Sequence, residues 1–202
     1  MRKGGGGDVF WHAGAQRPDA GTGVTVWITG LPAAGKSTIA CAVEERLIEL
    51  RVPCYRLDGD NLRHGLNSDL EFSAVDRDEN VRRVSEVARL FADAGLVAIC
   101  ALVSPYEEAR ARARRMHDML GLPFLEVHLS TSLAVCERRD PKGLYARARA
   151  GELTGMTGVD DPYERPSRPD VEIDSGAESV ERAVDQILDV LLRVRPIRAP
   201  SM

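Results

Sequence analysis

The 202-residue sequence contains no long run of apolar side chains. A membrane-spanning helix needs about 20 consecutive, mostly apolar residues, and no stretch approaches that length. The first ten residues, MRKGGGGDVF, also lack the apolar core of a secretory signal. These absences argue against a membrane or secreted protein, and we expect the chain to be cytoplasmic.

Other common signals are missing as well. The cysteines Cys41, Cys54, Cys100 and Cys136 show no C-x-x-C spacing and fall in apolar patterns, which predicts buried, reduced thiols. No N-K-x-D motif for reading guanine occurs, which argues against a translational-type GTPase. The formal net charge of −4 argues against broad binding of nucleic acid.

Lysine is scarce, because only three of the 27 basic residues are lysines: Lys3, Lys36 and Lys142. Lysine is a compact point charge, whereas arginine presents a wide planar fork. Retention of lysine at positions 36 and 142 therefore indicates a role there, although so small a number also allows chance.

The residues that are present predict one globular domain. Hydrophobic residues make up 44% and charged residues 29%, which is ordinary for a domain of this length. Strands alternate with helices from Val24 onward, which predicts an α/β fold with a parallel sheet of about five strands. We expect a flexible arm at 1–23 with a docking point at Phe10–Trp11, the domain at 24–195 and a tail at 196–202.

The predicted strands are VTVWIT, PCYRLD, LVAICALV, FLEVHL and VEID. Helical spacing runs from Ser37 to Leu50, from Val81 to Phe91, through YEEARARARRMHDML and from Val180 to Leu192. Two stretches interrupt this alternation. GDNLRHGLNSDLEFSAVDRD is expected to be an irregular functional loop, and residues 136–169 to contain one short helix around Leu144–Ala150.

A phosphate-binding loop lies between the first strand and the first helix. It consists of Gly30, Leu31, Pro32, Ala33, Ala34, Gly35, Lys36, Ser37 and Thr38. Its glycines let backbone N–H groups face phosphate oxygens at the positive end of the helix. Lys36 is expected to reach the β- and γ-phosphates, and the Ser37 hydroxyl to bind Mg²⁺. The loop predicts binding of a nucleoside triphosphate such as ATP.

Polar residues follow two other predicted strands. Asp58 and Asp60 end the second strand and Ser104 ends the third, and the carboxyl ends of parallel strands face a common ligand crevice. A carboxylate there can hold Mg²⁺ through water or accept a proton from an attacking hydroxyl, although an acidic turn is the alternative. Arg63 and Arg77 flank a loop that contains Phe72, a pattern typical of an anion clamp beside a stacking platform. Spacing alone leaves a plain surface role equally open for them.

These segments together resemble one family, the adenylylsulfate kinases (APS kinases). The resemblance covers roughly residues 11–192 and includes LDGDNLRHGLNSDLEFSAVDRDENVRRVSEVARLFADAG, VSPY, ERRDPKGLYARARAGE and TGVDDPYE, in that order. The DGDN and DPKGLY motifs are far more specific than the phosphate loop. The resemblance implies a three-layer P-loop kinase domain with helices on both faces of the sheet and a mobile lid at about 140–168.

The implied reaction transfers the γ-phosphate of ATP to the ribose 3′-hydroxyl of adenosine 5′-phosphosulfate (APS). The products are 3′-phosphoadenosine 5′-phosphosulfate (PAPS) and ADP. The resemblance assigns catalytic roles to Lys36, Asp58 and Lys142, with Asp58 accepting or orienting the proton of the 3′-hydroxyl. It assigns Ser37, and Asp60 through water, to Mg²⁺. The implied APS-binding residues are Asp60, Arg63, Phe72, Arg77, Asn80, Val103, Ser104, Lys142, Leu144 and Met156.

Two departures from the family pattern bear on these assignments. Pro32–Ala33 stand where the family often has Ser-Gly or Ser-Ser, a change that leaves the essential loop residues in place. Met156 stands where a phenylalanine often forms the second wall around the APS adenine, and a methionine supplies a polarisable apolar face instead. Ser104 occupies a position where a phosphoserine intermediate has been considered in the family, and direct transfer is the simpler expectation.

Two alternative functions share the phosphate loop. One is another small-molecule P-loop kinase, acting on a nucleoside monophosphate or a sugar, and the DGDN and DPKGLY motifs argue against it. The other is a catalytically silent nucleotide-binding regulatory domain, and the retention of Lys36, Ser37, Asp58 and Asp60 argues against that. The family also suggests a homodimer and a possible functional association with an ATP sulfurylase.

Overall fold

The structure is a computed structural model that describes residues 23–195. The expected docking point at Phe10–Trp11 and the expected tail at 196–202 lie outside the described residues. Within residues 23–195, no helix combines the length and the apolar character needed to cross a membrane.

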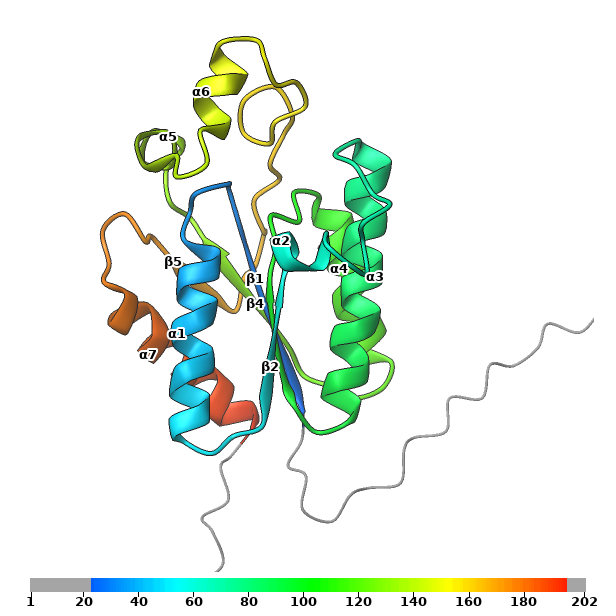
Figure 1. Cartoon of the computed structure of the whole chain (residues 1–202). Coiled ribbons are helices and arrows are strands. Elements are labelled where there is room, and N and C mark those ends of the chain that lie inside the picture. The colour runs from blue at the N-terminus through cyan, green and yellow to red at the C-terminus, as the bar shows by residue number, and fades with distance from the viewer. Residues whose placement is uncertain (1–22, 196–202) are drawn as a thin grey trace, which may run out of the picture.

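A five-stranded parallel sheet forms the centre of the domain (Figure 1). Its strands are β1 (Val24–Gly30), β2 (Cys54–Asp58), β3 (Val97–Ala101), β4 (Phe124–Leu129) and β5 (Val171–Ile173), and they are arranged in the order β2-β3-β1-β4-β5. β1 lies in the middle and pairs with β3 on one side and β4 on the other. All seven of its residues are buried, as expected for a strand covered on both faces. The predicted parallel sheet is confirmed.

Helices cover both faces of the sheet and so complete three layers. α1 (Lys36–Glu49) and α7 (Val180–Val194) pack on the face to which Val26 and Ile28 of β1 point. α3 (Ala74–Asp93) and α4 (Glu107–Asp118) pack on the opposite face, around Trp27. Successive side chains of a strand point to opposite faces, which is why β1 supplies both cores. The expected three-layer fold is confirmed.

The polar segment 59–78 is more regular than predicted. It contains the short helix α2 (Gly59–Leu62), and α3 already begins at Ala74. The Ser73 hydroxyl caps α3 by accepting a hydrogen bond of 3.2 Å from the backbone N–H of Asp76. The expectation of an irregular loop holds for residues 63–73 and is wrong for 59–62 and 74–78, where the helices lie outside the apolar periodicity.

Two further short helices, α5 (Leu133–Arg139) and α6 (Leu144–Arg149), follow β4. The expected helix near 144–150 is confirmed as α6, whereas α5 was not predicted. Together with residues 150–157 they rise above the carboxyl ends of the strands at the top of Figure 1. α6 and residues 150–157 lie within the lid expected at about 140–168, whereas α5 precedes it.

The cysteine prediction holds only in part. All four cysteines are free thiols, and Cys100 and Cys136 are buried as expected. Cys41 and Cys54 are partly exposed, which corrects the expectation for those two. Cys41 lies on α1, where it contacts the side chain of Glu45 one turn further along the helix rather than the core.

Candidate active site

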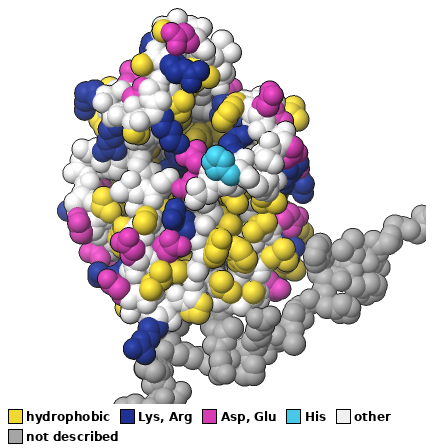
Figure 2. All heavy atoms as spheres, in the orientation of Figure 1, with side chains coloured by type: hydrophobic (Ala, Val, Ile, Leu, Met, Phe, Trp, Pro, Cys, Tyr) yellow, Lys and Arg dark blue, Asp and Glu magenta, His cyan; other side chains and the backbone are white. Residues whose placement is uncertain are grey.

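The carboxyl ends of the sheet strands open into one cavity of about 920 Å³. The overhanging segment with α5 and α6 bounds it on one side and the start of α3 on another. Figure 2 shows a hollow between these parts, with apolar side chains inside it and Lys, Arg, Asp and Glu side chains around it. Of the site residues predicted from sequence, only Gly30, Leu31 and Ala34 are not among those lining the cavity. Residues distant in the sequence therefore share one site.

The phosphate loop owes its shape to residues with positive φ. Gly30 has φ 153°, and a Cβ atom at this position would lie 2.9 Å from the carbonyl oxygen of Leu129 on the neighbouring strand. Gly35 has φ 94° and precedes the first residue of α1. Ala33 also adopts a left-handed conformation, with φ 60°, which is unfavourable for a residue with a Cβ atom. The two glycines are thus required by backbone geometry.

Lys36 folds back onto this loop. Its Nζ donates hydrogen bonds of 3.0 Å to the carbonyl oxygen of Gly30 and 2.7 Å to that of Leu31. Burial of the ammonium lowers the pKa of Lys36 to about 8, although the nearby carboxylates of Asp60 and Asp58 oppose this effect. The loop therefore holds a cation whose charge depends on pH in the physiological range.

Three residues that the sequence reasoning missed support the loop from outside. The Tyr145 hydroxyl of α6 donates to the carbonyl oxygen of Pro32 at 3.0 Å. The Ser175 hydroxyl donates to the carbonyl oxygen of Ala34 at 2.7 Å and accepts from Arg139 Nη1 at 2.9 Å. Ser175 follows β5, so the rule that located Asp58 and Ser104 at strand ends would also have found it. Tyr145 and Arg139 lie within the quoted motif ERRDPKGLYARARAGE, but neither follows a strand, so that rule does not find them.

The two aspartates after β2 differ in their surroundings. Asp58 is only 6% exposed, and its Oδ1 accepts a hydrogen bond of 3.0 Å from the backbone N–H of Asp60. Its Oδ2 lies 3.7 Å from Arg56 Nη1. The Asp60 carboxylate is largely exposed and forms an ion pair with Lys142 from the overhanging segment. Asp58 is therefore a fixed carboxylate at the cavity wall, whereas Asp60 connects the wall to that segment.

Arg63 and Arg77 both contact the exposed Phe72 loop. The Arg63 guanidinium carbon lies 4.2 Å from the centre of the Phe72 ring, and its Nη1 donates to the carbonyl oxygen of Leu70 at 2.8 Å. Arg77 Nε donates to the carbonyl oxygen of Phe72 at 2.9 Å. Two cations beside an aromatic ring at a cavity wall can bind an anionic group attached to a planar base.

Asn80 faces the same wall from α3 and is held by a residue that was not predicted. Its Oδ1 accepts a hydrogen bond of 2.9 Å from Nδ2 of Asn67, which is fully buried. This contact occupies the acceptor of the Asn80 amide and leaves its NH₂ group as the donor for a ligand.

Ser104 lies in the loop after β3, next to Val103. Its φ of 38° is left-handed, and the residue is 3% exposed. The hydroxyl accepts a hydrogen bond of 3.1 Å from Trp27 Nε1 and donates one of 3.0 Å to Thr29 Oγ1. These buried partners engage the hydroxyl within the domain.

Met156 and Leu144 line the cavity from the overhanging segment. Met156 is only 4% exposed and packs with the core on the α1 and α7 side, while its backbone N–H donates to Asp160 Oδ1 at 2.6 Å. Phe72 lines the same cavity but is 62% exposed. The two expected walls around an adenine are thus one buried side chain and one exposed ring.

Comparison with known proteins agrees with this geometry. The family model described as adenylylsulphate kinase matches residues 22–174. The adenylyl-sulfate kinase of Clostridium acetobutylicum is 50% identical over 169 residues, which are 84% of this chain and 83% of that protein. The bifunctional enzyme CysN/CysC of Mycobacterium tuberculosis is 52% identical over 169 residues, which are 84% of this chain but 27% of that enzyme.

Solved structures give the same result. The structure of the Mycobacterium tuberculosis APS kinase CysC in complex with AMPPNP and APS matches with a TM-score of 0.82 and 51% identity. The match covers 85% of this chain and 98% of that one. The family match spans well over half of the chain, and the relatives are about half identical to it. The chain therefore belongs to the adenylylsulphate kinase family of ATP-dependent phosphotransferases.

Proposed function

We propose that this protein transfers the γ-phosphoryl group of ATP to the 3′-hydroxyl of APS, forming PAPS and ADP, and that the cavity residues named above perform the reaction. The observation that carries the proposal is the shared cavity of about 920 Å³, which is lined on one side by the phosphate loop and on the other by Asp58, Arg63 and Phe72. A donor site and an acceptor site thus meet without an intervening wall. The related mycobacterial kinase bound an ATP analogue together with APS.

On the donor side, the phosphate loop binds the triphosphate. Its backbone N–H groups and the N-terminus of α1 face the phosphate oxygens. Lys36 leaves the carbonyl oxygens of Gly30 and Leu31 and moves to the β- and γ-phosphates, where its positive charge offsets the charge of the transferred group.

The cavity residues fit a Mg²⁺ ion shared with the nucleotide. Within residues 23–195, no group of three or more His, Cys, Asp or Glu side chains forms a metal cage. Mg²⁺ commonly takes only one or two protein oxygens and completes its shell with water and phosphate oxygens. The Ser37 hydroxyl and, through water, the Asp60 carboxylate would hold the ion, which would supply charge neutralisation between the β- and γ-phosphates.

On the acceptor side, Asp58 orients the 3′-hydroxyl and accepts its proton. The bond between the 3′-oxygen and the γ-phosphorus forms while the bond to the leaving ADP oxygen breaks, and the proton passes to the carboxylate. Arg63, Arg77 and Asn80 hold the phosphosulfate and ribose. The adenine lies between Phe72 and Met156, and Val103, Ser104 and Leu144 complete the pocket.

Residues 140–168 act as a lid over both nucleotides. Lys142 pairs with Asp60 in the structure, and in the closed complex its ammonium turns to the phosphates. A closed lid excludes water and so protects ATP from hydrolysis.

We also propose that the protein assembles as a homodimer and works beside an ATP sulfurylase. The bifunctional mycobacterial relative supports the second part, because the region similar to this chain is only 27% of that enzyme. Light scattering of the purified protein, alone and mixed with a sulfurylase, tests both associations.

One assay tests the proposed reaction. The protein is incubated with Mg²⁺, ATP and APS, and PAPS is quantified by anion-exchange chromatography, with AMP and gluconate as alternative acceptors. We expect PAPS to form, to disappear when a chelator removes Mg²⁺, and to be absent with Lys36→Ala. Turnover of AMP or gluconate without PAPS would instead identify another small-molecule kinase, and no turnover with intact ATP binding would identify a silent regulatory domain.

A further inference from the structure

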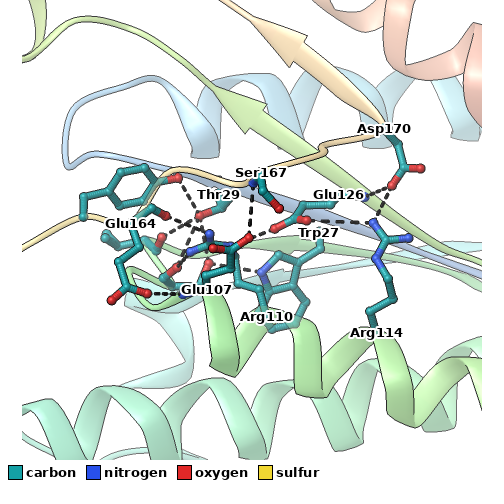
Figure 3. A network of polar contacts seen from close by, with 12 residues as sticks. Trp27, Thr29, Glu107, Arg110, Arg114, Glu126, Glu164, Ser167 and Asp170 are labelled. Carbon is teal, nitrogen blue, oxygen red and sulfur yellow. Dashed lines mark hydrogen bonds and ion pairs between the residues drawn. The ribbon is translucent and has the colours of Figure 1, made fainter.

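A buried arginine outside the predicted site joins three segments around the acceptor pocket. Arg110 of α4 is only 1% exposed. Its Nε donates to Glu126 Oε1 on β4, its Nη1 to the carbonyl oxygen of Ser104 and its Nη2 to that of Glu164, each at 2.7 Å. Figure 3 shows Arg110 with Glu126 and Glu164 in this network of polar contacts. A single side chain therefore connects the core sheet, the loop after β3 and the C-terminal end of the lid.

Two of these segments are also tied directly to each other. The backbone N–H of Glu164 donates to the carbonyl oxygen of Pro105 at 2.8 Å, and the Glu164 carboxylate accepts from the backbone N–H of Glu107 at 2.6 Å. Arg110 thus stabilises a junction between the returning end of the lid segment and the loop that carries Ser104. Val103, Ser104 and Pro105 of that loop line the cavity.

The conformation that Arg110 holds is one that the chain would not adopt by itself. Ser104 has φ 38°, and left-handed backbone is unfavourable for a residue with a side chain. Strain of this kind persists only where the surroundings determine the conformation. Trp27 and Thr29 hold the Ser104 hydroxyl, while Arg110 holds its carbonyl oxygen.

An arginine is required for this arrangement. Its planar fork presents donors on three nitrogens in different directions, whereas a lysine ammonium is a compact point charge. The Glu126 carboxylate compensates the buried charge, as a guanidinium without a partner would be costly there. A lysine at this position would keep the ion pair with Glu126 but would lose the simultaneous contacts to both carbonyl groups.

We propose that Arg110 is a positioning residue for the acceptor nucleotide, because it holds the Ser104 loop and the end of the lid in the geometry that binds APS. The inference rests on the proposed function. None of the three hydrogen bonds of Arg110 goes to the phosphate loop. Loss of this side chain therefore weakens the binding of APS rather than the binding of ATP.

The test compares Arg110→Lys with a matched control on the same helix, Arg114→Lys. Arg114 also contacts Glu126, at 3.8 Å, and donates to a carbonyl oxygen, that of Phe124, at 2.8 Å, but it does not reach the Ser104 loop. We expect Arg110→Lys to raise the KM for APS about tenfold, as the loss of one hydrogen bond predicts, with the KM for ATP unchanged. Arg114→Lys is expected to change neither KM.

Two outcomes would overturn the proposal. One is an equal rise in both KM values for Arg110→Lys, and the other is an equal rise in the KM for APS for both variants. If Arg110→Lys does not fold, Glu126→Gln replaces it, since this variant removes the charge that orients the guanidinium and keeps all three acceptors. A smaller but selective rise in the KM for APS supports the proposal, and an unchanged KM contradicts it. Wild-type PAPS formation, measured in the same series, separates failure of the proposed function from failure of this inference.

Discussion

Arg77 donates a hydrogen bond of 2.7 Å to the hydroxyl of Thr157, across 80 positions of the sequence. Nη2 of the same guanidinium donates to the carbonyl oxygen of Gly155 at 2.5 Å. Its Nε lies 3.8 Å from Oδ2 of Asp161. The first turn of α3 is thereby attached to the lid segment. A residue assigned to APS binding thus also holds the segment expected to close over it, which couples the two events.

Separate substitutions distinguish these two roles of Arg77. We expect Thr157→Val to loosen the lid segment, because it removes one acceptor but keeps the side-chain shape, and to change the KM for APS little. Arg77→Lys loses both contacts and the fork that binds APS, so it is expected to loosen the segment and to raise the KM for APS. The rate of trypsin cleavage after Lys142, Arg147 and Arg149 measures the first effect. Unchanged cleavage in Thr157→Val would contradict the attachment.

Asp58→Asn tests the proton acceptor. Asparagine keeps the oxygen that caps α2 but cannot take a proton at neutral pH, so the fold is preserved. We expect kcat to fall by about a hundredfold or more, the usual contribution of a general base, while binding of AMPPNP stays at the wild-type level. Calorimetric titration with AMPPNP and a steady-state assay measure the two quantities. A kcat close to that of the wild type would remove Asp58 from this role.

The pKa of Lys36 predicts a descending limb in the pH profile for ATP. In the free enzyme this pKa is lowered from 10.5 to about 8, so the ammonium loses its charge above about pH 8. We therefore expect kcat/KM for ATP to fall above that pH, since this ratio reports groups of the free enzyme. Lys36→Arg serves as control, because arginine stays charged and should remove the limb even if it lowers activity. A wild-type profile that is flat up to 10.5 would contradict the prediction.

The lowered pKa of Lys36 also affects stability. Here the free energy of unfolding is expected to rise with pH, whereas kcat/KM for ATP falls. Between about pH 8 and 10.5 the Lys36 amine is largely protonated in the unfolded chain and largely deprotonated in the folded protein. The contribution of this group to the free energy of unfolding therefore rises as the pH increases through that window. Chemical denaturation of the wild type and of Lys36→Met across the window measures it.

Met156 is predicted to act as a rigid wall for the acceptor. We expect Met156→Ala to lower the free energy of unfolding by about 2 kcal/mol or more, because the side chain is buried, and to raise the KM for APS. Met156→Leu conserves volume and is expected to leave both nearly unchanged. Urea denaturation and steady-state kinetics provide the measurements. A KM for APS that is unchanged in Met156→Ala would show that the adenine does not rest on this residue.

The parts of the structure that the sequence predicted correctly depend on local patterns. The phosphate loop is continuous in the sequence, and its glycines have the positive φ that the motif requires. The strands β1 and β3 were visible as apolar runs, because a parallel sheet covered on both faces buries every residue of its inner strands. The position of Asp58 and Ser104 at the cavity followed from the rule that parallel strands end on one edge.

The missed parts depend on contacts between distant segments. Tyr145 supports the loop only because α6 folds back over Pro32, a pairing across 113 positions. Arg110 occurs in a charged helix, YEEARARARRMHDML, in which nothing distinguishes it from Arg112 or Arg114 until β4 and the Ser104 loop surround it. Periodicity assigns a residue to a face of a helix, but it does not show which of several arginines donates hydrogen bonds to three acceptors.

The sequence by itself determined the kind of chemistry. A nine-residue loop specifies phosphate binding through backbone conformation, which is local, and the family resemblance carried by the DGDN and DPKGLY motifs implies the acceptor. Only the tertiary structure decided how the acceptor pocket is held. The carbonyl oxygens of Ser104 and Glu164 lie 60 positions apart in the sequence and meet at Arg110 because packing of α4 on the sheet brings them there. Such long-range contacts arise from the folded arrangement, and no local pattern encodes them.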